Sequence, residues 1–189
     1  MNAIDRRTFC TAGSGALLAA ALPALPGCAS APDAAAAVRA ELGAPGTLRA
    51  AINYGNPILA SRGADGQPRG VSVDLAREAA RRLGVAAELV TFTSAGSVVD
   101  AVKAKQVDLA FVAIDPVRAA DMEYTAPYVI IEGAYLVRND SALQRNEEVD
   151  RAGTRIAVGR GSAYDLYLTR ALKAATLVHA PTSRPSSRP

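Results

Sequence analysis

The apolar positions in the first half of the chain fall into three short segments of strand type. Residues 47–53 and residues 86–92 each have the pattern of one β-strand. Residues 107–114 are almost continuously apolar, interrupted only by Asp108. A continuous apolar run of this length is typical of a strand that is covered on both faces. We therefore predict three strands, the third of them buried between helices.

The segments between these strands have helical periodicity. Residues 71–84 predict one helix, because four apolar residues share a face and Gly84 is placed to end it. Ser94 is expected to cap a second helix that runs to about residue 105. The resulting β-α-β-α-β order implies a parallel sheet with right-handed crossovers, hence an α/β fold. The inward face of the first helix is formed by Val73, Ala76, Ala80 and Leu83.

A second β-α-β pattern begins in the second half of the chain. Residues 131–138 predict a strand that leads away from the first unit, and a polar loop follows. A strand, a tight turn at residues 159–162, a helix and a further strand come next. This second unit is not completed before the end of the chain. Its expected elements are strand 155–158, helix 163–174 and strand 176–179.

The carboxyl ends of the predicted strands carry a group of polar residues. In open parallel sheets, ligands bind at these ends of the strands. Asn53 and Asn56 follow the first strand, and Asp115 and Arg118 follow the third. The sequence therefore places these four side chains at the edge of a ligand cleft.

Composition excludes several other classes of protein. The chain has 189 residues and a net charge of +3, but its arginines are scattered and no basic stripe with aromatic residues is present, so nucleic-acid binding is not expected. One histidine and two cysteines are too few to favour a structural zinc site. We predict no cofactor and no metal. A core of modest side chains must hold the fold.

The first 28 residues have the pattern of an export signal. A charged start with Arg6 and Arg7 precedes an apolar stretch that is too short to span a membrane. The Arg-Arg-Thr-Phe segment resembles a twin-arginine signal, and the segment Leu-Pro-Gly-Cys ending at Cys28 resembles a lipobox. Cys28 is therefore either a lipid attachment point or a small residue near an ordinary cleavage site. Either outcome predicts a location in the periplasm or on the outer face of the cell membrane.

Two further segments have compositions unlike that of a folded core. Residues 29–46 are rich in Ala with flanking Pro, which predicts a tether containing one short helix at about residues 32–42. Residues 181–189 consist mainly of Arg, Ser and Pro and predict a disordered tail.

Five segments in this order resemble family 3 of the bacterial extracellular solute-binding proteins. They are LRAAIN, GQPRGVSVDLAREAARRLG, KQVDLAFVAI, DPVRAADMEYTAPY and RIAVGRGSAYDLYL, and together they span about residues 47–178. The resemblance implies a periplasmic-binding-protein-like fold with two α/β lobes joined by a hinge. Lobe 1 would cover residues 47–135, and residues 136–180 would form an incomplete lobe 2. The family's acidic ligand residue of lobe 2 has no counterpart here, and we expect a truncated copy with impaired binding.

The resemblance also implies roles for particular residues. Arg118 lies six residues before Tyr124, the position at which the family's arginine holds the α-carboxylate of an amino acid. The alternative is a surface arginine in a short helix. Gly161 and Ser162 match the start of a helix in lobe 2 that faces an anion, although Ser162 could also be a plain N-cap. Tyr164 either lines the ligand cleft at the start of this helix or packs along its own helix.

The sequence departs from the family pattern at two places. Residues 112–115, Val-Ala-Ile-Asp, stand where most members carry a Ser-Gly-Met-Thr-like stretch whose backbone and hydroxyl groups receive the ligand's amino group, and Asp115 is the only one of the four with a polar side chain. It could accept an ammonium group instead, or it could cap the helix that starts at Pro116. The aromatic pair that often follows the first strand in the family is replaced by residues 54–57, Tyr-Gly-Asn-Pro. Asn53 and Asn56 could bind a ligand or shape the turn.

The leading hypothesis is a non-enzymatic receptor that delivers a small amino-acid-like or carboxylate-bearing solute to the membrane subunits of an ABC importer. An enzymatic rival exists because some relatives of this fold dehydrate cyclohexadienyl acids. Its general acid would have to be Asp115, Glu123 or Glu132, none of which lies in a motif. The other rival is a ligand-sensing domain of a signalling system, for which the sequence contains no effector domain.

Overall fold

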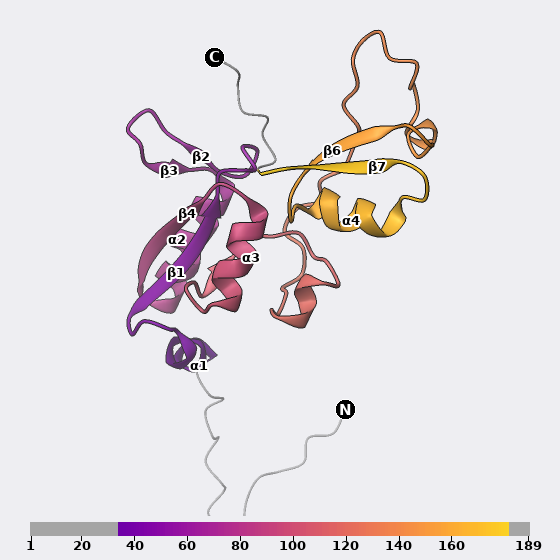
Figure 1. The fold of residues 1–189 in the computed structure, drawn as a ribbon. Coiled ribbons are helices and arrows are strands. Elements are labelled where there is room, and N and C mark those ends of the chain that lie inside the picture. The colour runs from indigo at the N-terminus through magenta and orange to yellow at the C-terminus, as the bar shows by residue number, and fades with distance from the viewer. Residues whose placement is uncertain (1–33, 182–189) are drawn as a thin grey trace, which may run out of the picture. The chain divides into compact units, whose positions relative to one another are not determined.

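The computed structural model describes residues 34–181 (Figure 1). Within this range the chain is mixed α/β, as the sequence predicts. The expected helix in the tether is present as α1 (Ala34–Glu41). The predicted export signal, including Cys28, and nearly all of the predicted tail lie outside the described residues. Among the helices described, none combines the length and apolar character needed to cross a membrane.

A three-stranded parallel sheet forms the centre of the first unit. Its order is β4-β1-β5, with β1 (Thr47–Asn53) in the middle. β4 (Ala86–Phe92) pairs with all of β1, from Thr47 opposite Ala86 to Asn53 opposite Phe92. Both long strands have the predicted bounds. The predicted parallel pairing is confirmed.

Helices α2 (Val71–Leu83) and α3 (Ala95–Lys103) cover opposite faces of β1. Successive side chains of a strand point to opposite faces of the sheet. Ala50 and Ile52 accordingly pack with Val73 of α2, whereas Ala51 packs with Val98 of α3. Ile52, Val73 and Val98 are the largest fully buried side chains.

Local sequence features fix the ends of both helices. Three of the four residues predicted for the inner face of α2 are buried, and Leu83 is partly exposed. Gly84 ends α2 in the left-handed conformation with φ of 67°, which glycine adopts without steric cost. Ser94 caps α3 by accepting a hydrogen bond from the Ser97 N–H at 3.2 Å. The helix ends at Lys103, slightly before the predicted residue 105.

The third predicted strand is much shorter than its apolar run. Within residues 107–114 only Leu109 and Ala110 form a strand, β5 (Leu109–Ala110), which pairs with β1 opposite Ala50 and Ala51. The predicted bounds of this strand are therefore wrong. The chain leaves the sheet edge after Ala110, and the later residues have no neighbouring strand among those described. Ile114 is 57% exposed, so this end is not covered on both faces.

A short hairpin precedes α2. It consists of β2 (Ser61–Arg62) and β3 (Pro68–Arg69), which pair in antiparallel fashion. A turn lies between them, where the Asp65 carboxylate accepts a hydrogen bond from the Gln67 N–H.

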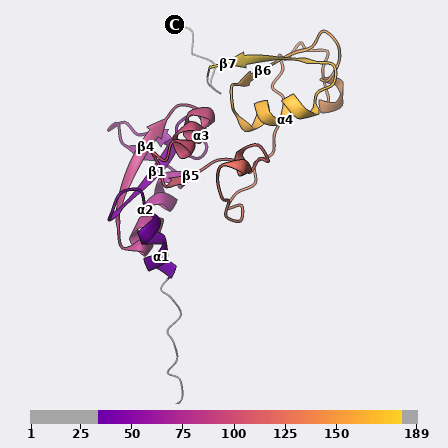
Figure 2. The same ribbon diagram turned by 60° about the horizontal axis from the view of Figure 1, so that its bottom comes forward.

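The second unit contains two parallel strands and one helix. β6 (Arg155–Gly159) pairs with β7 (Thr176–Ala180), and α4 (Ala163–Ala171) packs along them (Figure 2). Their apolar core includes Val149, Ile156, Val158 and Leu168. All three elements were predicted, although α4 ends three residues before residue 174. Two short 3-10 helices, η1 (Arg118–Ala120) and η2 (Asn146–Glu148), lie before this unit.

The segment at residues 131–138 is not a strand, so this prediction is wrong. It has no regular secondary structure, and it pairs with none of the described strands. Leu136 is fully exposed, and the neighbouring Ile130 is 86% exposed. A strand requires a partner edge for its backbone N–H and C=O groups, and no described segment offers one here.

Candidate functional site

Arg118 is the most deeply buried charged side chain of the described residues. It begins η1, shortly after β5, and is 3% exposed. Its guanidinium donates hydrogen bonds to the Ala113 carbonyl at 3.1 Å and to the Gly161 carbonyl at 2.8 Å. The Tyr124 hydroxyl donates to the same Ala113 carbonyl at 3.3 Å. The predicted pair of Arg118 and Tyr124 therefore meets at one backbone acceptor.

One N–H of Arg118 lacks an acceptor. The Nε atom is buried and has no hydrogen-bond partner in the part of the chain that the structure describes. Burial lowers the pKa of Arg118 from its usual value, while the nearby Tyr124 and Asp115 act in the opposite direction. A buried guanidinium whose protein acceptors are neutral carbonyls is electrostatically suited to an anion.

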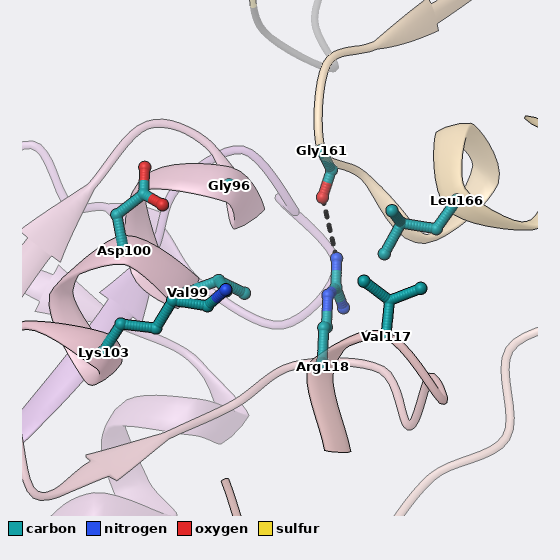
Figure 3. Close-up of a pocket in the computed structure, with 8 residues that line it drawn as sticks. All are labelled: Gly96, Val99, Asp100, Lys103, Val117, Arg118, Gly161 and Leu166. Atoms are coloured by element: carbon teal, nitrogen blue, oxygen red, sulfur yellow. Dashed lines mark hydrogen bonds between the residues drawn. The ribbon is translucent and has the colours of Figure 1, made fainter. Parts of the chain in front are cut away.

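A cavity of about 150 Å³ lies beside this guanidinium (Figure 3). Gly161 and Leu166 form one side of it, and residues of α3 form another. Lys103 of α3 is paired with Asp121 at 2.8 Å and so is already neutralised. The complete lining is Gly96, Val99, Asp100, Lys103, Val117, Arg118, Gly161 and Leu166.

The turn before α4 is held by a network around Asp165. Gly161 has φ of 69°, a left-handed conformation that favours glycine. Its N–H donates to the Asp165 carboxylate at 2.8 Å, while its carbonyl accepts from Arg118. The Ser162 hydroxyl caps α4 by accepting from the Asp165 N–H at 3.1 Å. Ser162 therefore makes the N-capping bond, and a role for Ser162 in binding a ligand stays a prediction.

Asp165 is itself anchored to β7 through the single histidine of the chain. The His179 Nε2 atom lies 2.7 Å from an Asp165 carboxylate oxygen. Burial raises the pKa of Asp165, but hydrogen bonds from the Gly161 N–H and His179 outweigh it and lower the pKa overall. Asp165 therefore stays ionised. Asp165 was not among the predicted site residues, although the spacing of Ser162 and Asp165 is that of a helix-capping pair.

Asp115 makes a turn hydrogen bond and an ion pair, and the helix predicted to start at Pro116 is present only as η1, which begins at Arg118 without a side-chain cap. It is 5% exposed and accepts a hydrogen bond from the Val117 N–H at 2.9 Å. Its other oxygen accepts from Arg170 of α4 at 2.8 Å. Burial raises the pKa of Asp115. The hydrogen bonds from Arg170 and the Val117 N–H lower this pKa by more than burial raises it, so the pKa of Asp115 is below its usual value. The ammonium role of Asp115 stays a prediction, and no local pattern pointed to Arg170.

A second cavity, of about 440 Å³, adjoins Asp115. The predicted site residues are therefore divided, with Arg118 and Gly161 on the first cavity and Asp115 and Tyr164 on the second. The lining of the second cavity is Ile114, Asp115, Pro116, Gly133, Ala163, Tyr164, Tyr167 and Arg170.

The two predicted asparagines lie at the carboxyl end of β1. The side-chain oxygen of Asn53 accepts a hydrogen bond from the Gly55 N–H at 2.8 Å, and that of Asn56 accepts from the Ile58 N–H at 3.3 Å. Both bonds shape the turn, and neither residue is among those that line the two cavities. A ligand role for them stays a prediction.

The described residues contain no group of His, Cys, Asp or Glu side chains that could hold a metal ion.

A parallel β-α-β sheet followed by a second α/β unit defines a periplasmic-binding-protein-like fold. The family model for "Bacterial extracellular solute-binding proteins, family 3" matches residues 48–176, and the chain belongs to this family. No curated protein sequence matches the chain.

Solved structures of amino-acid-binding proteins share this fold. One is an ancestral amino-acid-binding protein described as a precursor of cyclohexadienyl dehydratase, with a TM-score of 0.63 and 24% identity. A putative ABC-transporter binding component from Wolinella succinogenes, complexed with lysine, has a TM-score of 0.58 and 21% identity. A mutant of ArgBP from T. maritima has a TM-score of 0.60 and 22% identity.

The matches cover most of this chain but less of the relatives. They include 72%, 74% and 77% of this chain in the same order. They include 62%, 61% and 63% of the three solved chains. The chain therefore spans less than two thirds of the length of these relatives.

Proposed function

We propose that this protein is an extracytoplasmic receptor that binds a small carboxylate-bearing solute, such as an amino acid, for an ABC importer. Membership in the solute-binding family supports the receptor role. Structural neighbours that bind amino acids, including one complexed with lysine, support the solute class. The membrane subunits of the importer would be its protein partners.

The buried Nε–H of Arg118 carries the proposal for the ligand anchor. A guanidinium presents a planar fork of donors, and a carboxylate can accept two parallel hydrogen bonds from it. The Gly161 carbonyl now occupies part of this fork but is neutral. A ligand carboxylate that displaces it would supply both the missing acceptor and the missing negative charge.

Calorimetry of the full chain against a panel of amino acids tests the anchor. For an amino acid that binds, Arg118→Ala should weaken affinity by about 2–4 kcal/mol, because a buried charge pair loses one partner. Arg118→Lys keeps the charge but loses the fork, so it should restore only part of the affinity. Arg138→Ala is the matched control, since Arg138 is exposed and pairs only with Asp140 among the described residues. Equal affinity in wild type and Arg118→Ala would remove Arg118 from the site.

We further propose that the protein acts without catalysis. Of the three candidate acids, Glu123 and Glu132 are exposed and are not among the residues lining the two cavities. Asp115 lines the second cavity, but burial, which raises its pKa, is outweighed by hydrogen bonds from Arg170 and the Val117 N–H, so its pKa is lowered and it is a poor proton donor. Incubation with a cyclohexadienyl acid should therefore leave its ultraviolet spectrum unchanged. The appearance of an aromatic product would replace the receptor proposal with an enzymatic one.

Export and lipidation at Cys28 are proposed from the sequence pattern of residues 1–28. Mass spectrometry of the mature protein should find an acylated N-terminal Cys28. A mature chain that starts at Ala29 or later, without acyl mass, would leave export standing but exclude lipidation.

A further inference from the structure

Helix α4 exposes two tyrosines and one arginine along a single stripe. Tyr164, Tyr167 and Arg170 are spaced three residues apart, which places them on the same side of a helix. Tyr164 is 51% exposed and Tyr167 is 62% exposed. All three line the second cavity, whose volume of about 440 Å³ is typical of small-molecule sites. The proposed function makes no use of this stripe.

The apolar part of the second cavity is formed by rings and small groups. Ile114 is 57% exposed there, and Pro116 lies beside it in the lining. Gly133 packs directly against Tyr164, because an added Cβ would lie 3.0 Å from a ring carbon. The Tyr164 ring therefore has a fixed neighbour on one edge, while half of its surface remains open to a ligand. Flat aromatic groups stack well on such rings.

The polar end of the cavity carries available hydrogen-bond donors. A guanidinium has five N–H donors. Arg170 uses one of them for Asp115, and no second acceptor for it is found in residues 34–181. Asp115 is 5% exposed and receives the Val117 N–H on its other oxygen, so it is occupied. The Arg170 side chain is 43% exposed. Its guanidinium can therefore donate to a ligand while one of its N–H groups stays bonded to Asp115.

The local charge favours an anionic ligand. Asp115 is the negative group between Arg170, to which it is hydrogen-bonded, and Arg118, whose charge acts on it through space. These three groups carry two positive charges and one negative charge. While no solute carboxylate is bound to Arg118, a monoanion beside Arg170 would neutralise the net charge of these three groups.

We propose that the second cavity is a distinct binding site for an aromatic monocarboxylate. The aromatic ring lies on Tyr164 and Tyr167, and the carboxylate accepts hydrogen bonds from Arg170. The site does not require a solute on Arg118, and it goes beyond the proposed receptor function.

Calorimetry on the full chain with three probes tests the ligand class. Phenylacetate carries both the ring and the carboxylate, acetate carries only the carboxylate, and benzyl alcohol carries only a ring and a hydroxyl. Ring stacking and charge-assisted hydrogen bonds each contribute, so phenylacetate should bind at least about tenfold more tightly than either fragment. Equal affinities for phenylacetate and acetate would overturn the assignment of the ring site.

Variants then test the three side chains. Tyr167→Ala should weaken phenylacetate binding by about fivefold to tenfold through loss of stacking, whereas Tyr167→Phe should preserve it. Arg170→Lys keeps the charge but loses the fork, and should weaken binding by about tenfold. The control Arg138→Gln changes an exposed arginine away from the cavity lining and should have no effect.

The Arg118→Lys variant separates this site from the proposed receptor site. It should weaken amino-acid binding while leaving phenylacetate affinity unchanged. If phenylacetate affinity is unaffected by both Tyr167→Ala and Arg170→Lys in variants that unfold at the wild-type temperature, the proposed site is wrong. Loss of phenylacetate binding in Arg118→Lys alone would likewise refute a distinct second site.

Discussion

The strand β1 and the segment at residues 128–137 contain similar apolar residues but have opposite surroundings. β1 lies between β4 and β5, with Ile52 fully buried beneath α2. The other segment has no strand partner among the described residues, and its Leu136 is fully exposed. Apolar residues of strand type therefore form a strand only where a neighbouring edge accepts their backbone hydrogen bonds.

The two α/β units differ in the same way. The first has helices on both faces of a three-stranded sheet, and three of its large side chains are fully buried. The second has two strands and α4, and its core residues Ile156, Val158 and Leu168 keep 7–8% exposure. Parallel sheets are stable when both faces are covered, so the first unit should be the more stable part of the protein.

Hydrogen exchange should show the largest difference between these regions. Amides of β1 should open only with global unfolding, whereas those of residues 128–137 should exchange almost as in an unfolded chain, a difference of several orders of magnitude. Residues 155–178 should exchange faster than β1. Protection of residues 155–178 equal to that of β1 would contradict the proposed order of stability.

Core substitutions should give the next largest effect. Ile52→Ala should lower the free energy of unfolding by about 2–5 kcal/mol, because it leaves a cavity in a fully buried site. Leu136→Ala removes a similar side chain from the surface and should change the same quantity by less than about 0.5 kcal/mol. Urea unfolding measures both variants. A comparable loss in Leu136→Ala would mean that this leucine is buried in solution.

The network in the second unit should contribute less than a core residue. Asp165→Ala removes the acceptor for Gly161 and His179 and should cost about 1–3 kcal/mol in unfolding free energy. Asp165→Asn should cost less, since its oxygen can accept from Gly161 and its NH₂ can donate to a neutral His179. If both variants unfold like the wild type in urea, the network does not stabilise the turn.

The ion pair between Arg49 and Asp108 in the first unit should have the smallest effect on the free energy of unfolding, and this effect should depend on pH. The Asp108 carboxylate is bonded to the Arg49 side chain, which lowers its pKa from 3.8 to about 2, against a smaller opposing effect of burial. Because its folded pKa is depressed, Asp108 stabilises the protein above about pH 4, and this contribution disappears as the pH falls through about 2. Solvent screening reduces the contribution to about 1 kcal/mol.

Urea unfolding at about pH 5 and about pH 2.5 tests the role of Asp108, with Asp108→Asn as the reference. The wild type should lose more stability than the variant over this interval. Parallel pH dependence in the two proteins would show that the ion pair contributes nothing measurable.

Much of the first unit could be predicted because its determinants are local. The bounds of β1 and β4 follow from their apolar patterns, and the ends of the helices follow from Gly84 and Ser94. Arg118 could be chosen as a site residue because its spacing to Tyr124 is a feature of the sequence. Hydrophobic periodicity, helix caps and residue spacing each involve only residues that are close in the sequence, so they can be recognised without the tertiary structure.

Long-range partners could not be predicted in this way. Arg170 meets Asp115 across 55 positions of the chain, and Arg118 meets the Gly161 carbonyl across 43. The sequence by itself determined the α/β class, most elements and the candidate arginine. Only the tertiary structure decided that β5 ends at Ala110 and that four of the predicted site residues are divided between two separate cavities. The physical reason is that strand pairing, burial and ion pairing depend on neighbours that folding, not sequence proximity, brings together.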